Sequence, residues 1–382
     1  MIRCSPAAAA TELRDIRCMG SRDYTRLVLD LSGDTPYQLR RVPAADGSPA
    51  RVYVDLPGAR TNRQQPACAS RGPLARMQTI RTDHGLRLVL DVPNVSAARA
   101  FPLLDPFRLV VDVEAAALSR APTPTAAAST TTAGAGDTRA GAPVPTPGHA
   151  ARLTIVLDPG HGGKDPGARG VGGVQEKDIV LAVALRLRER LQAVPNVAVV
   201  LTRDRDEFLS LEERTARANA EPADLFVSIH ANAGPHPTQS GIETYYLNNT
   251  NDRATLRLAA LENGVASVTG RTHSREVSLL LSSLIQDYKV AESATFAATV
   301  QRELVATVAT RWPTVVDLGV KQGPFYVLVG AGMPCILVEV SFVTHPEEGA
   351  RLATPAYQDA LCDGLLRGIQ RFIDQHHATS AL

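Results

Sequence analysis

Two histidines follow short apolar runs that predict buried strands. His161 stands in a glycine-rich loop directly after the run 155–159, and His230 follows Leu225–Ile229. Ligands of an open α/β sheet bind at the carboxyl ends of its strands, so we expect the two imidazoles to lie close together. Imidazole is a common metal ligand, and this placement therefore indicates a metal site. A tight turn that happens to hold a surface histidine is the alternative for His161.

Two glutamates stand at comparably informative positions. Glu176 falls in the first turn of a helix predicted from the spacing of apolar residues between Ile179 and Leu191. The helix dipole also favours a carboxylate there, so a structural role is its alternative. Glu339 interrupts the otherwise apolar run Ile336–Phe342, which predicts a buried strand. A buried, unpaired carboxylate is costly, so Glu339 needs either a salt bridge to an arginine or a function.

Together these four residues have the composition of a metal-assisted hydrolase. His161, Glu176 and His230 would supply two nitrogens and one oxygen to Zn²⁺ and leave the fourth tetrahedral position for water. Glu339 would accept the proton of the attacking water and deliver it to a leaving amine. The chemistry that this combination indicates is zinc-dependent hydrolysis of an amide.

The elements that would position these residues alternate between strands and helices, which predicts an α/β fold. Strands are expected at Ile155–Leu157, Val197–Leu201, Leu225–Ile229, Ile242–Leu247, Val327–Val329 and Cys335–Val340. Helices are expected after Glu176, at Leu209–Ala220, in two pieces between about 251 and 310, and at about Ala356–Gln375.

The first part of the chain contains an internal repeat. Thr25–Leu31 recurs as Gly85–Val92, and Arg51–Leu56 recurs as Arg108–Val113. Four segments of this kind, separated by Gly, Pro and Asp turns, predict a small all-β sandwich of two similar sheets within residues 1–116. This domain contains no cluster of His, Cys or Glu, so we interpret it as a binding module.

Composition supports a division into two domains and a linker. The Ala-, Pro- and Thr-rich segment 117–151 cannot bury enough apolar surface to fold, which predicts a disordered linker before the domain 152–382. The chain has 382 residues and a net charge of only +1, so nothing indicates a nucleic-acid partner. It contains no apolar run of the roughly 18 residues that a transmembrane helix needs. Cys18 and Cys68 could form a disulfide in an oxidising compartment, and this stays open.

Four segments resemble, in order, the motifs of the zinc N-acetylmuramoyl-L-alanine amidases of bacterial cell walls. They are Asp158–Gly163, Glu176–Lys177, Ser228–Asn232 and Val338–Phe342. The resemblance runs through residues 152–377. It implies a mostly parallel six-stranded sheet flanked by helices, zinc ligands at His161, Glu176 and His230, and Glu339 as the catalytic carboxylate. The implied reaction cleaves the amide between N-acetylmuramic acid and L-alanine of peptidoglycan.

The resemblance also implies a cellular role. The repeated β segment resembles the peptidoglycan-binding AMIN domain that often precedes these amidases. Such enzymes act in the periplasm or cell envelope during cell-wall remodelling and daughter-cell separation. The N-terminal residues contain no apolar h-region, so we predict no complete signal peptide in this sequence. One departure is Phe342–His345, where the family often has Phe-x-Ser-Asn, which puts local hydrogen bonding near the site in doubt.

The helical segment at about 251–290 resembles the regulatory insertion of the septal amidases. In that family an acidic residue of the insertion covers the zinc until an activator protein displaces it. Glu262 is our first candidate for this residue and Glu276 the second, with a solvated helix glutamate as the alternative.

Two other functions compete with the amidase. The first is a catalytically silent peptidoglycan-binding protein, which the complete set of four site residues disfavours. The second is a nucleotide-binding protein whose glycine loop holds a phosphate. That loop, however, lacks a Gly-Lys-Ser/Thr ending and the Gly-x-Gly-x-x-Gly spacing.

Overall fold

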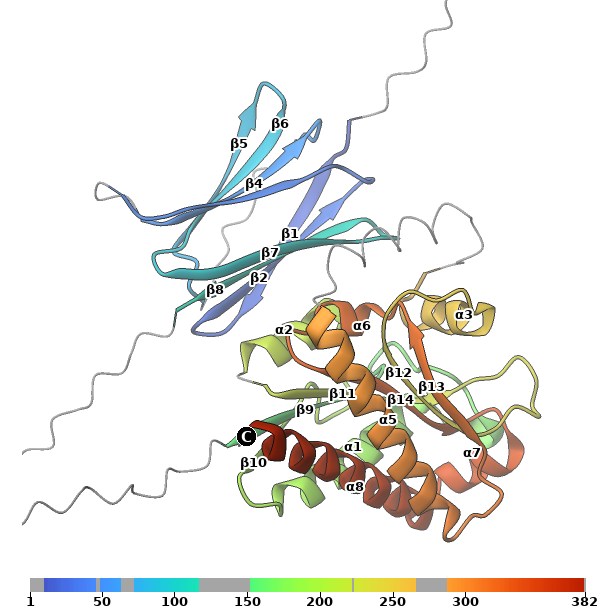
Figure 1. Ribbon diagram of the computed structural model, residues 1–382. Helices are drawn as coiled ribbons and strands as arrows, with labels where there is room; N and C mark the ends of the chain where they lie inside the picture. The colour runs from blue at the N-terminus through green and yellow to red at the C-terminus, as the bar shows by residue number, and fades with distance from the viewer. Residues whose placement is uncertain are drawn as a thin grey trace, which may run out of the picture.

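The computed structural model describes residues 10–45, 49–62, 72–116, 152–221, 223–265 and 287–380. They form two units, an all-β unit that ends at residue 116 and an α/β unit that begins at residue 152 (Figure 1). The expected linker 117–151, the second candidate Glu276 and Cys68 lie outside the described residues. Cys18 is disulfide-bonded. No helix in the described ranges is long and apolar enough to cross a membrane.

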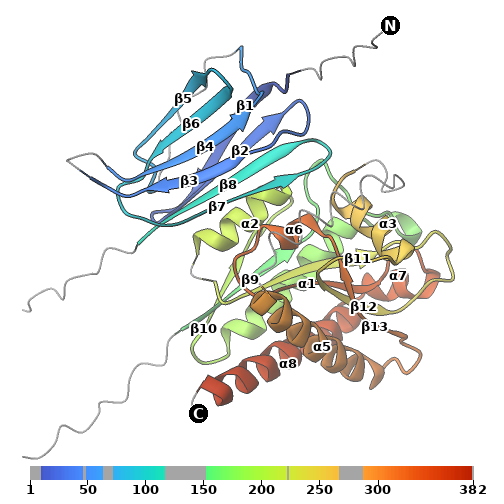
Figure 2. The same ribbon diagram turned by 45° about the horizontal axis from the view of Figure 1, so that its top comes forward.

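Eight strands form the β unit as two antiparallel sheets with the orders β1-β2-β8-β7 and β3-β4-β6-β5 (Figure 2). The strands are β1 (Leu13–Gly20), β2 (Tyr24–Leu31), β3 (Gln38–Val42), β4 (Arg51–Pro57), β5 (Arg76–Thr82), β6 (Gly85–Asp91), β7 (Val95–Leu103) and β8 (Arg108–Ala115). Alternate residues such as Val52, Val54 and Leu56 are buried between the sheets, because successive side chains of a strand point to opposite faces. The expected all-β fold is confirmed.

The internal repeat supplies the two central strands of each sheet. Strand β2 pairs with β8 in one sheet, and β6 pairs with β4 in the other. Arg26 lies opposite Asp112 in the first pair, and Arg87 lies opposite Asp55 in the second. The repeat therefore places the same arginine–aspartate pair once in each sheet.

A six-stranded sheet with the order β10-β9-β11-β14-β12-β13 forms the centre of the α/β unit. Its strands are β9 (Leu153–Pro159), β10 (Val197–Leu201), β11 (Leu225–Asn232), β12 (Ile242–Leu247), β13 (Asp317–Gly323) and β14 (Cys335–Phe342). Four strands are parallel, and β12 and β13 run in the opposite direction. The expected mostly parallel six-stranded sheet is confirmed.

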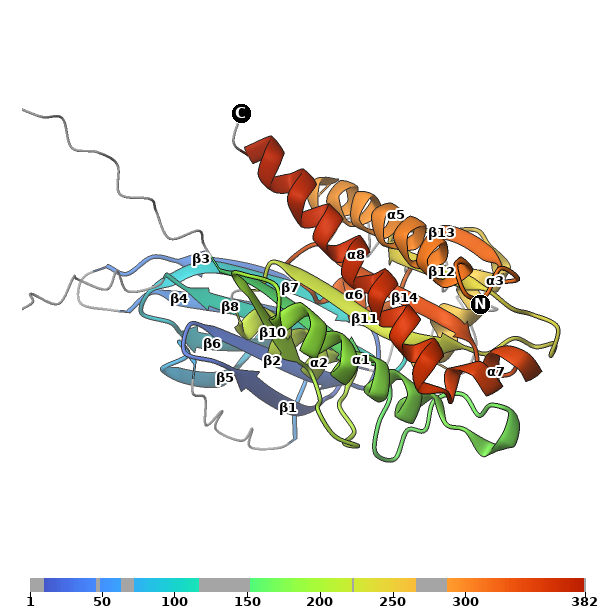
Figure 3. The ribbon, with the colours of Figure 1, turned by 90° about the horizontal axis from the view of Figure 1, so that it is seen from below.

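Helices cover both faces of this sheet. One face packs against α1 (Glu176–Gln192), α5 (Asp287–Ala309) and α8 (Pro355–Ser380), and Figure 3 shows α8 lying between the other two. The other face packs against α2 (Leu211–Ala220), α3 (Arg253–Glu262) and α6 (Tyr326–Val329). A short 3-10 turn at Val171–Gly173 precedes α1, and α7 (Pro346–Leu352) follows β14.

The run Val327–Val329, which we expected to be a strand, is the helix α6. The sixth strand is instead β13, which we missed because its sequence, Asp-Leu-Gly-Val-Lys-Gln-Gly, has no continuous apolar run. A short apolar run fits a buried helix turn as well as a strand, and Val327 and Leu328 are buried under the sheet.

The two units pack against each other. The sheet β1-β2-β8-β7 lies on α2 and α6, as the views of Figures 1 and 2 agree. These two helices therefore separate the β unit from the six-stranded sheet.

Candidate metal centre and catalytic carboxylate

Two neighbouring strands deliver a histidine each to the same edge of the sheet. Strands β9 and β11 are parallel, with Ile229 opposite Pro159. His230 therefore lies beside Gly160, and a Cβ on that glycine would stand 2.3 Å from the imidazole. The ring centroids of His161 and His230 are 4.9 Å apart. The structure thus brings together the two histidines that the sequence analysis selected.

The backbone and ring of His161 are both held in place. Its φ of +55° lies in the left-handed region, which a residue other than glycine seldom adopts without support. Its Nδ1 lies 2.9 Å from Asp165 Oδ2. A carboxylate oxygen accepts only, so Nδ1 carries the proton and Nε2 is the nitrogen left to bind a ligand.

Two buried arginines support the loop that carries His161. Arg214 donates to the carbonyls of Pro159 at 2.7 Å and His161 at 2.6 Å. Arg203 donates to the carbonyl of Gly160 at 2.6 Å. Burial and repulsion from Arg214 lower the pKa of Arg203 to about 10, so it remains a cation near neutral pH. The sequence analysis missed both arginines, although Arg203 also follows a strand that ends at this edge.

Glu176 connects the two histidines. Its Oε2 lies 3.1 Å from His161 Nε2, and its Oε1 lies 3.0 Å from His230 Nδ1. The backbone N–H groups of Ala168 and Ala231 donate to the same carboxylate at 2.8 and 3.0 Å. Burial by itself raises the pKa of Glu176, but the two histidines outweigh it and lower that pKa well below its ordinary value. Glu176 is therefore ionised and is a candidate metal ligand.

Glu262, the last residue of α3, joins this cluster as a fourth group. Its Oε2 lies 3.0 Å from His230 Nδ1 and 3.4 Å from His161 Nε2. Its side chain is 12% exposed, so it is not a solvated helix glutamate. Burial lowers the pKa of His230, but Glu262 and Glu176 reverse this and raise it to about 10.

These four side chains can hold a metal ion. One ligand atom from each of the residues lies within 4.8 Å of the others. His161 Nε2 and Glu262 Oε2 have no hydrogen-bond partner in the described structure, so a cation between them would satisfy both atoms. Two imidazole nitrogens with carboxylate oxygens are a donor set that suits zinc.

Glu339 lies opposite His230, on the neighbouring strand β14. It is completely buried, and neither carboxylate oxygen has a partner among the described residues. The salt bridge to an arginine that we considered is therefore not formed there. Burial and the neighbouring carboxylates, opposed by His230, raise the pKa of Glu339 well above its ordinary value. The raised pKa favours the protonated form of this carboxyl group, which can serve as a proton donor.

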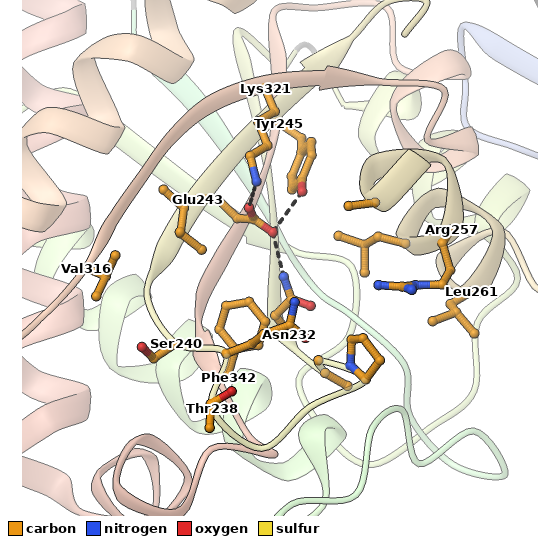
Figure 4. Close-up of a pocket in the computed structure, with 17 residues that line it drawn as sticks. Asn232, Thr238, Ser240, Glu243, Tyr245, Arg257, Leu261, Val316, Lys321 and Phe342 are labelled. Carbon is orange, nitrogen blue, oxygen red and sulfur yellow. Dashed lines mark hydrogen bonds and ion pairs between the residues drawn. The ribbon is translucent and has the colours of Figure 1, made fainter. Parts of the chain in front are cut away.

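A second buried glutamate lies directly across from Glu339, on strand β12. Glu243 accepts hydrogen bonds from Asn232 at 2.6 Å and Tyr245 at 2.8 Å, and forms an ion pair with Lys321. Figure 4 shows the three partners converging on it from different sides. We missed Glu243, although a charge inside a buried strand is the signal that identified Glu339.

Two cavities adjoin this group of side chains. The first, of about 320 Å³, lies beside Glu243 and is bounded on its other side by α3, which contributes Arg257 and Leu261 (Figure 4). The second, of about 250 Å³, is lined by both histidines and Glu262 of the cluster, and by Pro106 and Arg108 of the β unit. The β unit therefore reaches the surroundings of the candidate metal centre.

A sequence profile of N-acetylmuramoyl-L-alanine amidases matches residues 155–371, which is more than half of the chain and contains all the candidate ligands. The chain belongs to this family. It is 29% identical over 385 residues to the N-acetylmuramoyl-L-alanine amidase AmiC of Escherichia coli O6:H1, covering 96% of this chain and 90% of the relative. It is 31% identical over 389 residues to AmiC of Neisseria meningitidis serogroup B, covering 96% and 91%.

Solved structures of similar proteins carry the same family name. The N-acetylmuramoyl-L-alanine amidase of Clostridium difficile 630 is 31% identical and covers 59% of this chain and 98% of its own, with a TM-score of 0.46. Family membership makes this protein an amidase that cleaves the bond between N-acetylmuramic acid and L-alanine in peptidoglycan. This family assignment favours the amidase over both alternatives of the sequence analysis, the nucleotide-binding protein and the silent wall-binding protein.

Proposed function

We propose that this amidase works with a zinc ion held by His161, Glu176 and His230, and with Glu339 as its catalytic carboxylate. The observation that carries the proposal is the position of Glu339, which is buried opposite a candidate ligand and has no partner among the described residues. The donor set of two nitrogens and one carboxylate fits zinc. When bound there, the ion supplies Lewis-acid chemistry for the scissile carbonyl and for the attacking water.

The protein's own residues handle the proton. Glu339 accepts it from the attacking water as the carbon–oxygen bond forms. The same carboxyl group then donates it to the nitrogen of L-alanine as the carbon–nitrogen bond breaks. The raised pKa of Glu339 suits this second step, because a carboxyl group of ordinary pKa would seldom keep the proton near neutral pH. Asp165 keeps His161 oriented throughout through its 2.9 Å contact with Nδ1.

Glu262 is proposed to block the site. Its Oε2 stands where a fourth ligand to the metal would stand, within hydrogen-bonding reach of both imidazoles. Substrate cannot take that position until α3 moves, so the enzyme would exist in a closed and an open state. An activator protein that binds the insertion at about 251–290 is the partner that we propose for opening it.

The remaining assignments follow from the resemblance and the nearly full-length match to two amidases. We propose residues 1–116 as an AMIN-type peptidoglycan-binding domain, 117–151 as the linker and 152–382 as the catalytic domain. The protein would act in the periplasm or cell envelope during daughter-cell separation. Cells that lack it should then remain joined in chains, and a fluorescent fusion should gather at the septum.

Mass analysis of digested peptidoglycan tests the reaction. Stem peptides that begin with L-alanine are the expected product, and Glu339→Gln should release them far more slowly than the wild type. A chelator should abolish the release and Zn²⁺ should restore it. Sugar fragments without free stem peptides would contradict the proposal. Metal analysis and calorimetric titration of Zn²⁺ into the chelated protein test the site without relying on activity, and His161→Ala should weaken binding.

A further inference from the structure

The outer face of the sheet β1-β2-β8-β7 is buried on the α/β unit, with one arginine at the centre of the contact. The Nε and Nη2 groups of Arg26 donate to Asp112 at 2.6 and 2.7 Å. Its other donors cross to the α/β unit and reach the carbonyls of Glu212 at 3.1 Å and Gly330 at 2.9 Å, and the hydroxyl of Thr215. All five guanidinium N–H groups are therefore used, three of them across the interface.

This arrangement makes the contact specific. Burying an ion pair is costly unless all its hydrogen-bonding groups are satisfied. The β unit satisfies only part of Arg26, and helices α2 and α6 supply the remaining acceptors. The repeat-related Arg87 has no such arrangement, because it donates to Asp55 alone among the described residues and its side chain is 35% exposed. Only one of the two equivalent faces is therefore matched to the α/β unit.

Apolar contacts join the same two surfaces. Val28 and Phe101 of the β unit belong to a buried cluster, against which the partly buried Tyr326 and Val329 of α6 pack. The Tyr326 hydroxyl also donates to the Leu104 carbonyl at 3.2 Å. Helix α6 is only four residues long, so its position depends on what packs against it.

The first residue of α6 contacts Asn263, which directly follows Glu262. Asn263 Oδ1 accepts from the Tyr326 N–H at 2.8 Å, and Asn263 Nδ2 donates to the Pro324 carbonyl at 2.9 Å. Phe325, the N-cap of α6, has no side-chain acceptor, so Asn263 takes the capping role. Two hydrogen bonds thus connect the C-cap of α3 to the first residue of α6 and to Pro324 just before it.

We propose that docking of the β unit on α6 keeps Glu262 at the metal ligands, and that undocking opens the site. This inference rests on the blocking role proposed above for Glu262. Docking and blocking are coupled, so a partner that takes the Arg26 face shifts the enzyme toward its open state. The chemistry of that face fits a partner rich in carbonyl and hydroxyl oxygens, which are the groups that α2 and α6 now present to it.

The test compares two repeat-related variants of the full, zinc-loaded chain. Basal hydrolysis of a soluble muramoyl-peptide is measured without activator, so that binding to intact wall does not contribute. Arg26→Gln should raise the basal rate at least about fivefold, the lower end of common coupling effects. Arg87→Gln, the matched control on the exposed face, should leave it unchanged. Hydrogen exchange should accelerate in α3 and α6 of Arg26→Gln and not of Arg87→Gln.

Two further variants test separately the connection between α6 and α3 and the docking of the β unit. Asn263→Ala should raise the basal rate while the β unit stays docked, because it cuts only the connection between α6 and α3. Asn219→Ala removes a donor 2.8 Å from the Gly330 carbonyl and 3.3 Å from the Tyr24 hydroxyl. It weakens docking from the α/β side and replaces Arg26→Gln if that variant does not fold.

The outcomes distinguish this inference from the proposed function. If the folded docking variant keeps the basal rate of Arg87→Gln while Glu262→Ala raises it, the docking inference is wrong and the blocking role stands. If Glu262→Ala itself leaves the basal rate unchanged, the blocking role is wrong, and the docking inference falls with it. A raised rate in Glu262→Ala, Asn263→Ala and the docking variant together supports the whole chain of contacts.

Discussion

Two glutamates face each other on the neighbouring strands β12 and β14, yet their surroundings differ. Glu243 is held by Lys321, Tyr245 and Asn232, whereas Glu339 has no partner on either oxygen among the described residues. Burial is nearly the same for both, so the difference lies in the groups that point toward them. A buried carboxylate that is fully partnered supports the fold, and one that is left unpartnered is available for proton transfer.

Neutralising each glutamate in turn is the most direct test of this difference in role. Glu339→Gln should lower kcat by about 10²- to 10⁴-fold, the usual contribution of a general acid–base group. Glu243→Gln should cost far less activity and more stability. Release of stem peptides and thermal unfolding measure the two effects. Equal loss of activity in both variants would show that Glu243 belongs to the chemistry as well.

Removing Lys321 should make the surroundings of Glu243 more like those of Glu339, which has no partner among the described residues. Lys321→Met should lower the free energy of unfolding by about 1 to 3 kcal/mol, because it leaves the buried oxygens of Glu243 with fewer donors. Lys321 is itself 34% exposed, which favours the lower part of that range. Urea unfolding measures the change. Glu339→Gln serves as the control, since it should leave stability unchanged or increase it.

The pH dependence of stability should also differ. Burial raises the pKa of Glu339, so the folded protein favours the protonated carboxyl group. The stability from such a group is complete below the ordinary pKa of glutamate and is lost as pH rises toward the folded value. The wild type should therefore lose stability relative to Glu339→Gln above about pH 5. Urea midpoints of both proteins, each treated with a chelator, test this, and parallel pH profiles would contradict it.

The smallest expected effect comes from one hydroxyl group. Tyr245→Phe removes the donor 2.8 Å from Glu243 and leaves its other two partners in place. A loss of about 1 kcal/mol in unfolding free energy is expected, the usual net value of one hydrogen bond. A loss as large as that of Lys321→Met would mean that the tyrosine contributes as much as the lysine to holding Glu243.

Periodicity in the sequence predicted most of the α/β fold and failed where it was ambiguous. Strands β9, β11 and β14 are buried on both faces, so they appear as continuous apolar runs. Edge strand β13 has no such run and was missed. Helix α6 was mistaken for a strand, because three apolar residues satisfy either periodicity.

The sequence predicted the part of the candidate site that lies at the ends of strands. His161, His230 and Glu339 converge because parallel strands in register bring the residues at their ends together. Glu262 was named from a resemblance, and nothing in its own helix distinguished it from a solvated glutamate. The supporting arginines Arg203 and Arg214 were missed, because most of their contacts are with backbone carbonyls that no sequence pattern marks.

The sequence by itself determined the candidate ligands His161 and His230 at the sheet edge and the duplicated arginine–aspartate pair, because both follow from the local periodicity of strands. Only the tertiary structure decided which copy of that pair is buried and which glutamate reaches the histidines. Arg26 meets Gly330 across 304 positions of the chain, and Asn263 meets Tyr326 across 63. Contacts of this kind depend on how whole units pack, which local propensity does not encode.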